Sequence, residues 1–269
     1  MSGGIIMTEE KITDLMLPYL KGERLVRVFV PAHEEGEKLP VIYMTDGQNL
    51  FEEEKCTFGC WHVPEAVRDE RKNSGKAAIV VGVLNDNHRE RGDDLTPSTV
   101  AKFVYPNFRV KMMAKLFARP HAEKFDEFII NTVKPCVEEK FPVKTGRENT
   151  AFCGSSSGGL FSFFTSLSHP DVYGWAGVFS PAFIMFRPED LEKWIKSKLG
   201  SDVPFLYMYS GNGDKTEKEL SPGFLSTCGI LESCYPKEMY KKSFKEDALH
   251  NEGAWEPVFR DFLHCFLAG

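Results

Sequence analysis

The sequence predicts an α/β fold in which a mostly parallel sheet is covered by helices on both faces. Short apolar runs bounded by turn residues alternate along the chain with segments of helical period. The run 77–84, AAIVVGVL, is the most apolar and is rich in β-branched residues, which is typical of a strand buried on both faces. The segment 150–164 passes from an apolar strand through a glycine-rich turn into an apolar helix.

Each element is predicted from its local pattern. Apolar runs that stop at proline, glycine or polar turn residues predict strands at 25–30, 39–45, 77–84, 150–153, 174–180, 203–209 and, more weakly, 240–245. Helices are expected at 61–72, 121–140, 160–164, 188–199, in part of 215–239, and at 255–267. Pro135 lies inside one of these helices and predicts a kink there. No segment has the composition of a linker and no repeat is visible, so we expect one domain over 1–269.

The region 85–120 differs from the rest of the chain. It contains three prolines, has no clean period, and is long for a connection between two elements. Connections of this length in compact domains are usually binding loops or lids. Basic side chains, among them Arg109, Lys111 and Lys115, alternate there with aromatic residues and methionines. A solvated loop with a small apolar cluster of its own is the alternative interpretation.

Composition excludes several classes of protein. The net charge of -6 argues against general nucleic-acid binding. No apolar run approaches the ~20 residues that span a bilayer, and the first residues do not resemble a signal peptide. The seven scattered cysteines indicate reduced thiols. We therefore expect a cytoplasmic protein without a metal or other cofactor and without a membrane partner; a homo-oligomer is compatible with these properties.

The turn GSSSGG at 154–159 contains the pattern G-x-S-x-G in one register, centred on Ser156. In a strand–turn–helix of this kind, the central serine is held in a strained conformation with its hydroxyl exposed at the edge of the sheet. The amide of Ser157 then lies at the start of a helix, where it favours an anion. A flexible glycine/serine loop would have a similar composition.

A nucleophilic serine needs a base and a group that orients the base. His250 is the best-placed histidine, because it lies between the last predicted strand and the last helix. Asp214 follows the strand 203–209 in a glycine-rich turn, and we expect it to be the orienting acid. Asp214 could instead cap the next helix, on which Glu217 falls three residues later. The order Ser156, Asp214, His250 is the order of α/β hydrolases.

An oxyanion needs a second amide from the loop after an earlier strand. The turn 46–49, DGQN, directly follows the buried strand 39–45, which makes the amide of Gln48 the candidate. An ordinary tight turn is the alternative for DGQN. We expect the neighbouring Asp46, and Trp255 beyond the histidine, to contribute to substrate binding.

Four motifs taken together resemble the "putative esterase" family of α/β hydrolases. They are YMTDGQNLF at 43–51, GSSSGG at 154–159, GNGD at 211–214 and HNEGAW at 250–255. That family includes enterochelin esterases, feruloyl esterases and relatives of S-formylglutathione hydrolase. The resemblance implies Ser156 as nucleophile, His250 as base, Asp214 as acid, and the amides of Gln48 and Ser157 as oxyanion donors. The region 98–120 matches no pattern of the family, which leaves the substrate open.

These observations lead to one hypothesis and two alternatives. The hypothesis is a serine carboxylester hydrolase that forms an acyl-enzyme and acts on a small-molecule ester. Arg109, Lys111 and Lys115 favour an aryl or anionic ester of the feruloyl or siderophore type. One alternative is an acyltransferase that uses an acceptor other than water. The other is a binding protein that has the hydrolase scaffold but no catalytic activity.

Overall fold

A computed structural model describes residues 6–56, 59–85, 88–100, 112 and 119–269 of the chain. At its centre lies an eight-stranded sheet with the order β1-β2-β4-β3-β5-β6-β7-β8. All neighbouring strands from β4 to β8 are parallel, whereas β1 pairs with β2, and β2 with β4, in antiparallel fashion. The strands are β1 Lys11–Tyr19, β2 Gly22–Val30, β3 Val41–Met44, β4 Ile79–Val83, β5 Thr150–Ser155, β6 Trp175–Phe179, β7 Phe205–Gly211 and β8 Tyr240–Lys245. The predicted α/β class is confirmed.

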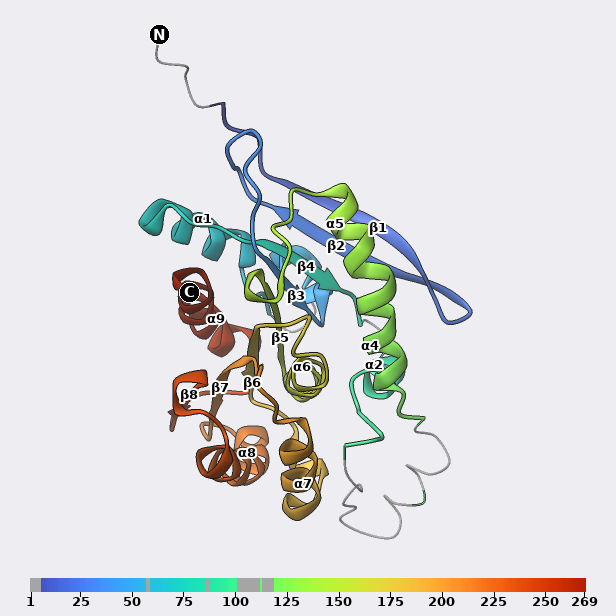
Figure 1. Cartoon of the computed structure of the whole chain (residues 1–269), viewed down its shortest axis with the longest axis vertical. Helices are drawn as coiled ribbons and strands as arrows, with labels where there is room; N and C mark the ends of the chain where they lie inside the picture. Colours follow the sequence, from blue (N-terminus) through green and yellow to red (C-terminus); the bar gives the residue numbers. More distant parts are fainter. Residues whose placement is uncertain (1–5, 57–58, 86–87, 101–111, 113–118) are drawn as a thin grey trace.

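Strand β1 was not predicted from the sequence. It lies at the edge of the sheet, and most of its side chains are exposed or half-buried. An edge strand of this kind needs no continuous apolar run, and its residues KITDLMLPY contain none. The hairpin β1–β2 extends beyond the other strands in Figure 1.

Helices cover both faces of the sheet (Figure 1). On one side lie α1 Val63–Ser74 and α9 Glu252–Ala268, and on the other lie α4 Ala122–Phe128, α5 Lys134–Lys140, α6 Ser157–Ser168 and α7 Pro188–Lys198. The helix α8 Lys215–Cys234 packs against α7 and β7. Side chains from strands reach both layers: Phe152 packs against Phe161 of α6, and Phe179 packs against Phe262 of α9. These strands are apolar throughout because both of their faces are buried.

The predicted helix 121–140 is one helical segment with an interruption. A π-helical turn at Ile129–Val133 separates α4 from α5, and Pro135 lies in the first turn of α5. Proline has no amide hydrogen to donate to the preceding turn, so the local backbone adopts another hydrogen-bonding pattern. The predicted kink at Pro135 thus corresponds in position to a π-helical turn, and whether the helix axis bends there stays a prediction.

The region 85–120, predicted as a lid or substrate loop, is described only in part. Its first half contains α2 His88–Asp94, which the sequence did not predict. The Asp94 carboxylate is fully buried and binds the Tyr19 hydroxyl at 2.5 Å, Arg24 at 2.9 Å and His121 at 3.0 Å. The first part of the region 85–120 is therefore anchored to the sheet through Asp94. The predicted basic residues at 109, 111 and 115 lie outside the described residues.

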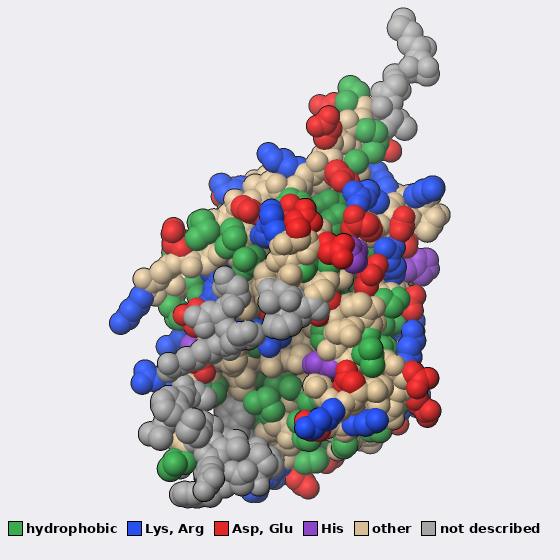
Figure 2. All heavy atoms as spheres, turned by 180° about the vertical axis from the view of Figure 1, so that it is seen from behind, with side chains coloured by type: hydrophobic (Ala, Val, Ile, Leu, Met, Phe, Trp, Pro, Cys, Tyr) green, Lys and Arg blue, Asp and Glu red, His purple; other side chains and the backbone are tan. Residues whose placement is uncertain are grey.

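The surface carries charges of both signs. On the face seen in Figure 2, basic and acidic side chains are intermixed, with hydrophobic ones between them. Among the described residues, no helix is both long enough and apolar enough to cross a membrane.

Candidate active site

Ser156 lies at the sharp turn between β5 and α6. Its backbone angles are φ 58° and ψ -122°, which non-glycine residues rarely adopt. A strained residue costs about 1–3 kcal/mol and persists only where its surroundings hold it. Here the Ser156 amide donates to the Phe179 carbonyl at 2.9 Å, and the Ser156 carbonyl accepts from the Ala182 amide at 3.3 Å. The turn predicted from G-x-S-x-G is thus a strained elbow and not a flexible loop.

The glycine at position 158 allows the elbow to pack against the end of β3. A Cβ atom on Gly158 would lie 2.2 Å from Oγ1 of Thr45 and 3.4 Å from a carboxylate oxygen of Asp46. The distance to Thr45 is far below van der Waals contact, so a larger residue fits at position 158 only if Thr45 or the elbow moves. The elbow and the turn after β3 are therefore direct neighbours, as an oxyanion site built from both would require.

His250 lies in the segment between β8 and α9, as predicted. Its Nδ1 atom is 3.0 Å from Oε1 of Glu217, and its side chain is 14% exposed. The Trp255 ring packs edge-on against the imidazole, with centroids 4.9 Å apart. The indole Nε1 of Trp255 donates to the Ser180 hydroxyl at 3.0 Å. Trp255 is almost fully buried and packs against the imidazole, and its contribution to substrate binding stays a prediction.

Glu217 is a fully buried carboxylate on the first turn of α8. Its Oε2 atom accepts from the Ser210 hydroxyl at 3.1 Å and from the Gly211 amide at 3.2 Å. Burial raises the pKa of this carboxyl, but hydrogen bonds from His250, Ser180 and Gly211 outweigh burial and hold the pKa below its usual value. Glu217 is therefore a preorganised anion in contact with the imidazole.

The expectation that Asp214 orients the imidazole is corrected by this geometry. Both carboxylate oxygens of Asp214 accept from backbone amides, Oδ1 from Glu217 at 2.8 Å and Oδ2 from His250 at 2.6 Å. Asp214 is thus the cap of α8, the alternative noted for it in the sequence. Only half of a capping box forms here, because the Glu217 side chain binds Ser210, Gly211 and His250.

Ser156 and His250 reach the same edge of the sheet from different strands. Ser156 follows β5, Ser180 follows β6, and Glu217 is bound at the end of β7, and these three strands are neighbours. Among the described residues, no hydrogen bond joins the Ser156 hydroxyl to the His250 imidazole. Catalytic hydrogen bonds are often long or poorly aligned without substrate, so the absence of this bond does not count against the pair.

The turn 46–49 after β3 is held by several polar contacts. The Asp46 carboxylate binds Arg91 through two bonds of 2.6 and 2.8 Å, and Asp46 adopts φ 56°. The Asp46 amide donates to Asn85 at 3.1 Å, and the Asn85 amide donates to the Gln48 side chain at 3.1 Å. Asp46 therefore shapes the turn through its ion pair with Arg91, and its contribution to substrate binding stays a prediction.

The roles of Gln48 and Ser157 as oxyanion donors stay predictions, but both residues lie in the elements expected for them. Gln48 is in the 3₁₀ turn Gly47–Asn49 directly after β3, and Ser157 is the first residue of α6. Within the described part of the chain, neither backbone amide has a hydrogen-bond acceptor. Amides left unpaired at a helix start and at an adjacent turn can bind an anion.

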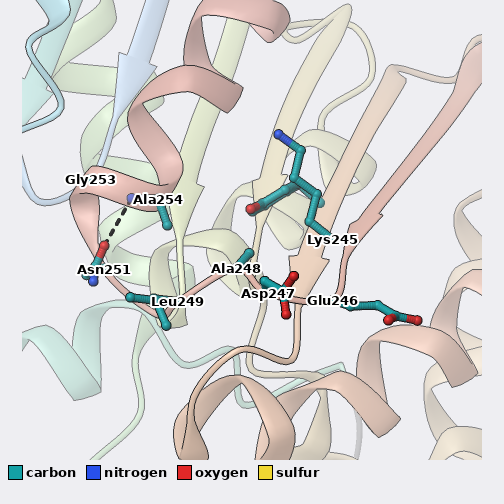
Figure 3. Close-up of a pocket in the computed structure, with 9 residues that line it drawn as sticks. Lys245, Glu246, Asp247, Ala248, Leu249, Asn251, Gly253 and Ala254 are labelled. Atoms are coloured by element: carbon teal, nitrogen blue, oxygen red, sulfur yellow. Dashed lines mark hydrogen bonds between the residues drawn. The ribbon is translucent and has the colours of Figure 1, made fainter.

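A hollow of about 640 Å³ lies along the segment 245–254 that carries His250 (Figure 3). Its lining includes Tyr209, Leu249 and Ala254, whereas Ser156, Glu217 and His250 do not line it. In Figure 3 the Asn251 side chain accepts from the Ala254 amide, at 3.0 Å. Asn251 therefore caps α9 and fixes where the segment after His250 becomes helical.

Comparison of the sequence with models of known protein families assigns the chain to a family. The family model described as "Putative esterase" matches residues 18–204, well over half of the chain. The chain belongs to this esterase family. The matched range contains Gln48, Ser156 and Ser157 but ends before Glu217 and His250. The choice of base and acid therefore depends on the geometry described above.

Two curated relatives of this esterase-family chain carry esterase names. A "siderophore triacetylfusarinine C esterase" from Aspergillus fumigatus is 30% identical over 172 residues, which are 58% of this chain and 51% of the relative. An "endo-1,4-beta-xylanase/feruloyl esterase" from Xylanibacter ruminicola is 28% identical over 134 residues, 49% of this chain and 15% of the relative. The alignments thus span about half of one relative and a small part of the other.

Solved structures support the esterase-family fold. The BES protein from Bacillus cereus superimposes with a TM-score of 0.71 at 20% identity, covering 99% of both chains. A siderophore hydrolase from Aspergillus nidulans gives a TM-score of 0.68 at 20% identity and 98% coverage of both chains. At these identities the likeness concerns the fold.

Proposed function

We propose that this chain hydrolyses carboxylic esters through Ser156, His250 and Glu217. The observation that carries the proposal is the arrangement at one sheet edge. The strained residue Ser156 follows β5, and Ser180 follows the neighbouring strand β6 and binds Trp255, which packs against His250. The imidazole of His250 contacts the buried carboxylate of Glu217. Family membership and the esterase names of two relatives support the same reaction class.

In the first step, Oγ of Ser156 attacks the ester carbonyl while Nε2 of His250 takes the serine proton. Glu217, bound to Nδ1, keeps the proton on that nitrogen and stabilises the imidazolium that forms. The tetrahedral intermediate then expels the alcohol, which receives the proton from His250. Water attacks the acyl-enzyme by the same route, which releases the acid and restores the serine.

The negative charge that develops on the carbonyl oxygen would be bound by the amides of Gln48 and Ser157. The close packing of Gly158 against Thr45 brings their two segments together. Donors fixed in this way need no rearrangement when charge develops, which is the main source of their catalytic effect.

For the substrate, we propose aryl or siderophore-type esters, because the two relatives are named as feruloyl and siderophore esterases. The basic residues Arg109, Lys111 and Lys115 favour esters with a negative charge. Replacing the three by glutamine should raise KM for an anionic aryl ester more than for its neutral methyl analogue. An equal change for both esters would argue against this preference.

Labelling with a fluorophosphonate probe tests the reaction class directly. Wild-type protein should take up the probe on Ser156 and hydrolyse 4-nitrophenyl acetate. Ser156→Ala should abolish both, whereas Ser155→Ala, a matched change at the last residue of β5, should retain labelling. Absence of labelling in the wild type would refute the hydrolase and favour a binding protein on this scaffold. Ester formation with an added alcohol, with little free acid, would indicate an acyltransferase.

A further inference from the structure

Glu252 is a buried acidic residue for which the mechanism above has no role. It lies two residues after His250, at the first position of α9, and is 6% exposed. Its Oε1 atom accepts a hydrogen bond of 2.8 Å from Nδ2 of Asn49, which is 203 residues away in the chain. Buried carboxylates are rare without a specific partner, so this contact calls for an explanation.

The contact joins the turn that carries Gln48 to the segment that carries His250. Asn49 directly follows Gln48 and closes the 3₁₀ turn, in which its amide donates to the Asp46 carbonyl at 2.9 Å. The Asn49 carbonyl accepts from the Trp61 amide at 2.9 Å, so this residue is fixed on both sides. Glu252 fixes its side chain to the segment that carries His250.

Charged groups around Glu252 come from several elements. Burial raises the pKa of its carboxyl, the nearby Asp46 raises it further, and Asn49 and Arg91 act in the opposite direction. Gly59 also lies close to Glu252: a Cβ atom on Gly59 would be 3.3 Å from Cβ of Glu252.

We propose that Asn49 and Glu252 are positioning residues, whose hydrogen bond holds the Gln48 amide at a fixed place relative to His250. This inference rests on the proposed ester hydrolysis. An oxyanion donor acts in the transition state, so its displacement lowers kcat and leaves KM nearly unchanged. Loss of an entire donor costs about 10²–10³ in turnover, and displacement of one should cost about 10–100-fold.

A swap of donor and acceptor tests the proposal. Asn49→Asp alone places two carboxyl groups face to face, and kcat for 4-nitrophenyl acetate should fall about 10–100-fold. The double variant Asn49→Asp/Glu252→Gln restores a donor–acceptor pair with the direction reversed, and kcat should return to within about 3-fold of wild type. Glu256→Gln, on the next turn of α9, is the matched control and should keep wild-type kcat.

The pH dependence of Asn49→Asp separates positioning from a general loss of stability. The ratio of its kcat to that of wild type should rise as the pH is lowered from 8 to 6, because one shared proton restores the hydrogen bond. A double variant as slow as Asn49→Asp, or a ratio that does not change with pH, would overturn the proposal. These outcomes count only where the wild type labels at Ser156, so failure of the hydrolase assignment is recognised separately.

Discussion

Two carboxylates lie near His250, and exchanging each for its amide should separate their roles. In Glu217→Gln, the amide offers either a neutral oxygen or an N–H to Nδ1, so it no longer stabilises the imidazolium and can favour the wrong tautomer. Loss of the orienting carboxylate costs about 10⁴ in kcat, equivalent to about 5.4 kcal/mol at about 1.36 kcal/mol per tenfold. The Ser210 and Gly211 donors can still bind the Gln oxygen, so the fold should persist.

Asp214→Asn should have a much smaller effect on turnover. Asparagine is as good a helix cap as aspartate, and one side-chain oxygen can still accept a hydrogen bond from Glu217. The second oxygen, which binds the His250 amide, becomes an NH₂ group, so one hydrogen bond worth about 1 kcal/mol is lost. We expect a loss of about 10-fold in kcat.

The assay is steady-state hydrolysis of 4-nitrophenyl acetate, with Glu219→Gln as a control. Glu219 lies on the same helix with a largely exposed side chain, so this control should behave as wild type. A loss in Asp214→Asn equal to or greater than that in Glu217→Gln would refute the assignment of Glu217 as the acid.

Thermal unfolding gives a second readout for Asp214. Burial raises the pKa of its carboxyl, but amide hydrogen bonds from His250 and Glu217 dominate and lower the pKa in the folded state. A lowered pKa means that the stabilisation is complete above the ordinary aspartate pKa, about 3.9, and is lost as the pH falls through the folded-state value. Asp214→Asn should therefore destabilise the protein at pH 7 and have a diminishing effect toward pH 3.

Three further substitutions follow from contacts in the structure. Gly158→Ala should lower kcat at least about 10-fold, because the new methyl group would meet Oγ1 of Thr45 at 2.2 Å; wild-type activity with an unchanged melting temperature would contradict this. Trp255→Phe should lower kcat and change KM little, because it keeps a ring beside the imidazole but loses the indole hydrogen bond. Steady-state kinetics would measure the two parameters separately. In His169→Gln, the loss in free energy of unfolding should be greatest below about pH 6 and smaller by pH 9. The hydrogen bond to Asp126 raises the pKa of His169, and denaturant unfolding across this pH range would show no such pH dependence if that contact were unimportant.

The sequence predicted a structural feature well wherever the residues that cause it lie close together in the chain. The β-branched apolar run at 77–84 predicts a buried strand, and it contains β4 at Ile79–Val83. The elbow at Ser156 was predictable because glycines, a strand end and a helix start lie within a few residues of one another. The same locality explains the position of His250, just before the last helix.

The acid could not be chosen from the sequence, because the choice depends on contacts between distant segments. Asp214 and Glu217 both follow β7 and lie three residues apart, so their order along the chain does not separate them. The Asp214 carboxylate accepts a hydrogen bond from the backbone amide of His250, whereas the His250 imidazole contacts the carboxylate of Glu217. A preference for the residue nearest the strand end led to the incorrect choice.

The sequence by itself determined the α/β class, the strained turn at Ser156 and the family resemblance, because each depends on residues close together in the chain. The tertiary structure decided which carboxylate binds the imidazole, and it placed Asn49 against Glu252 across 203 residues. It also paired Asp46 with Arg91 and placed Trp255 between His250 and Ser180. Hydrogen bonds of this kind depend on distances of a few tenths of an ångström between segments that only the folded sheet brings together.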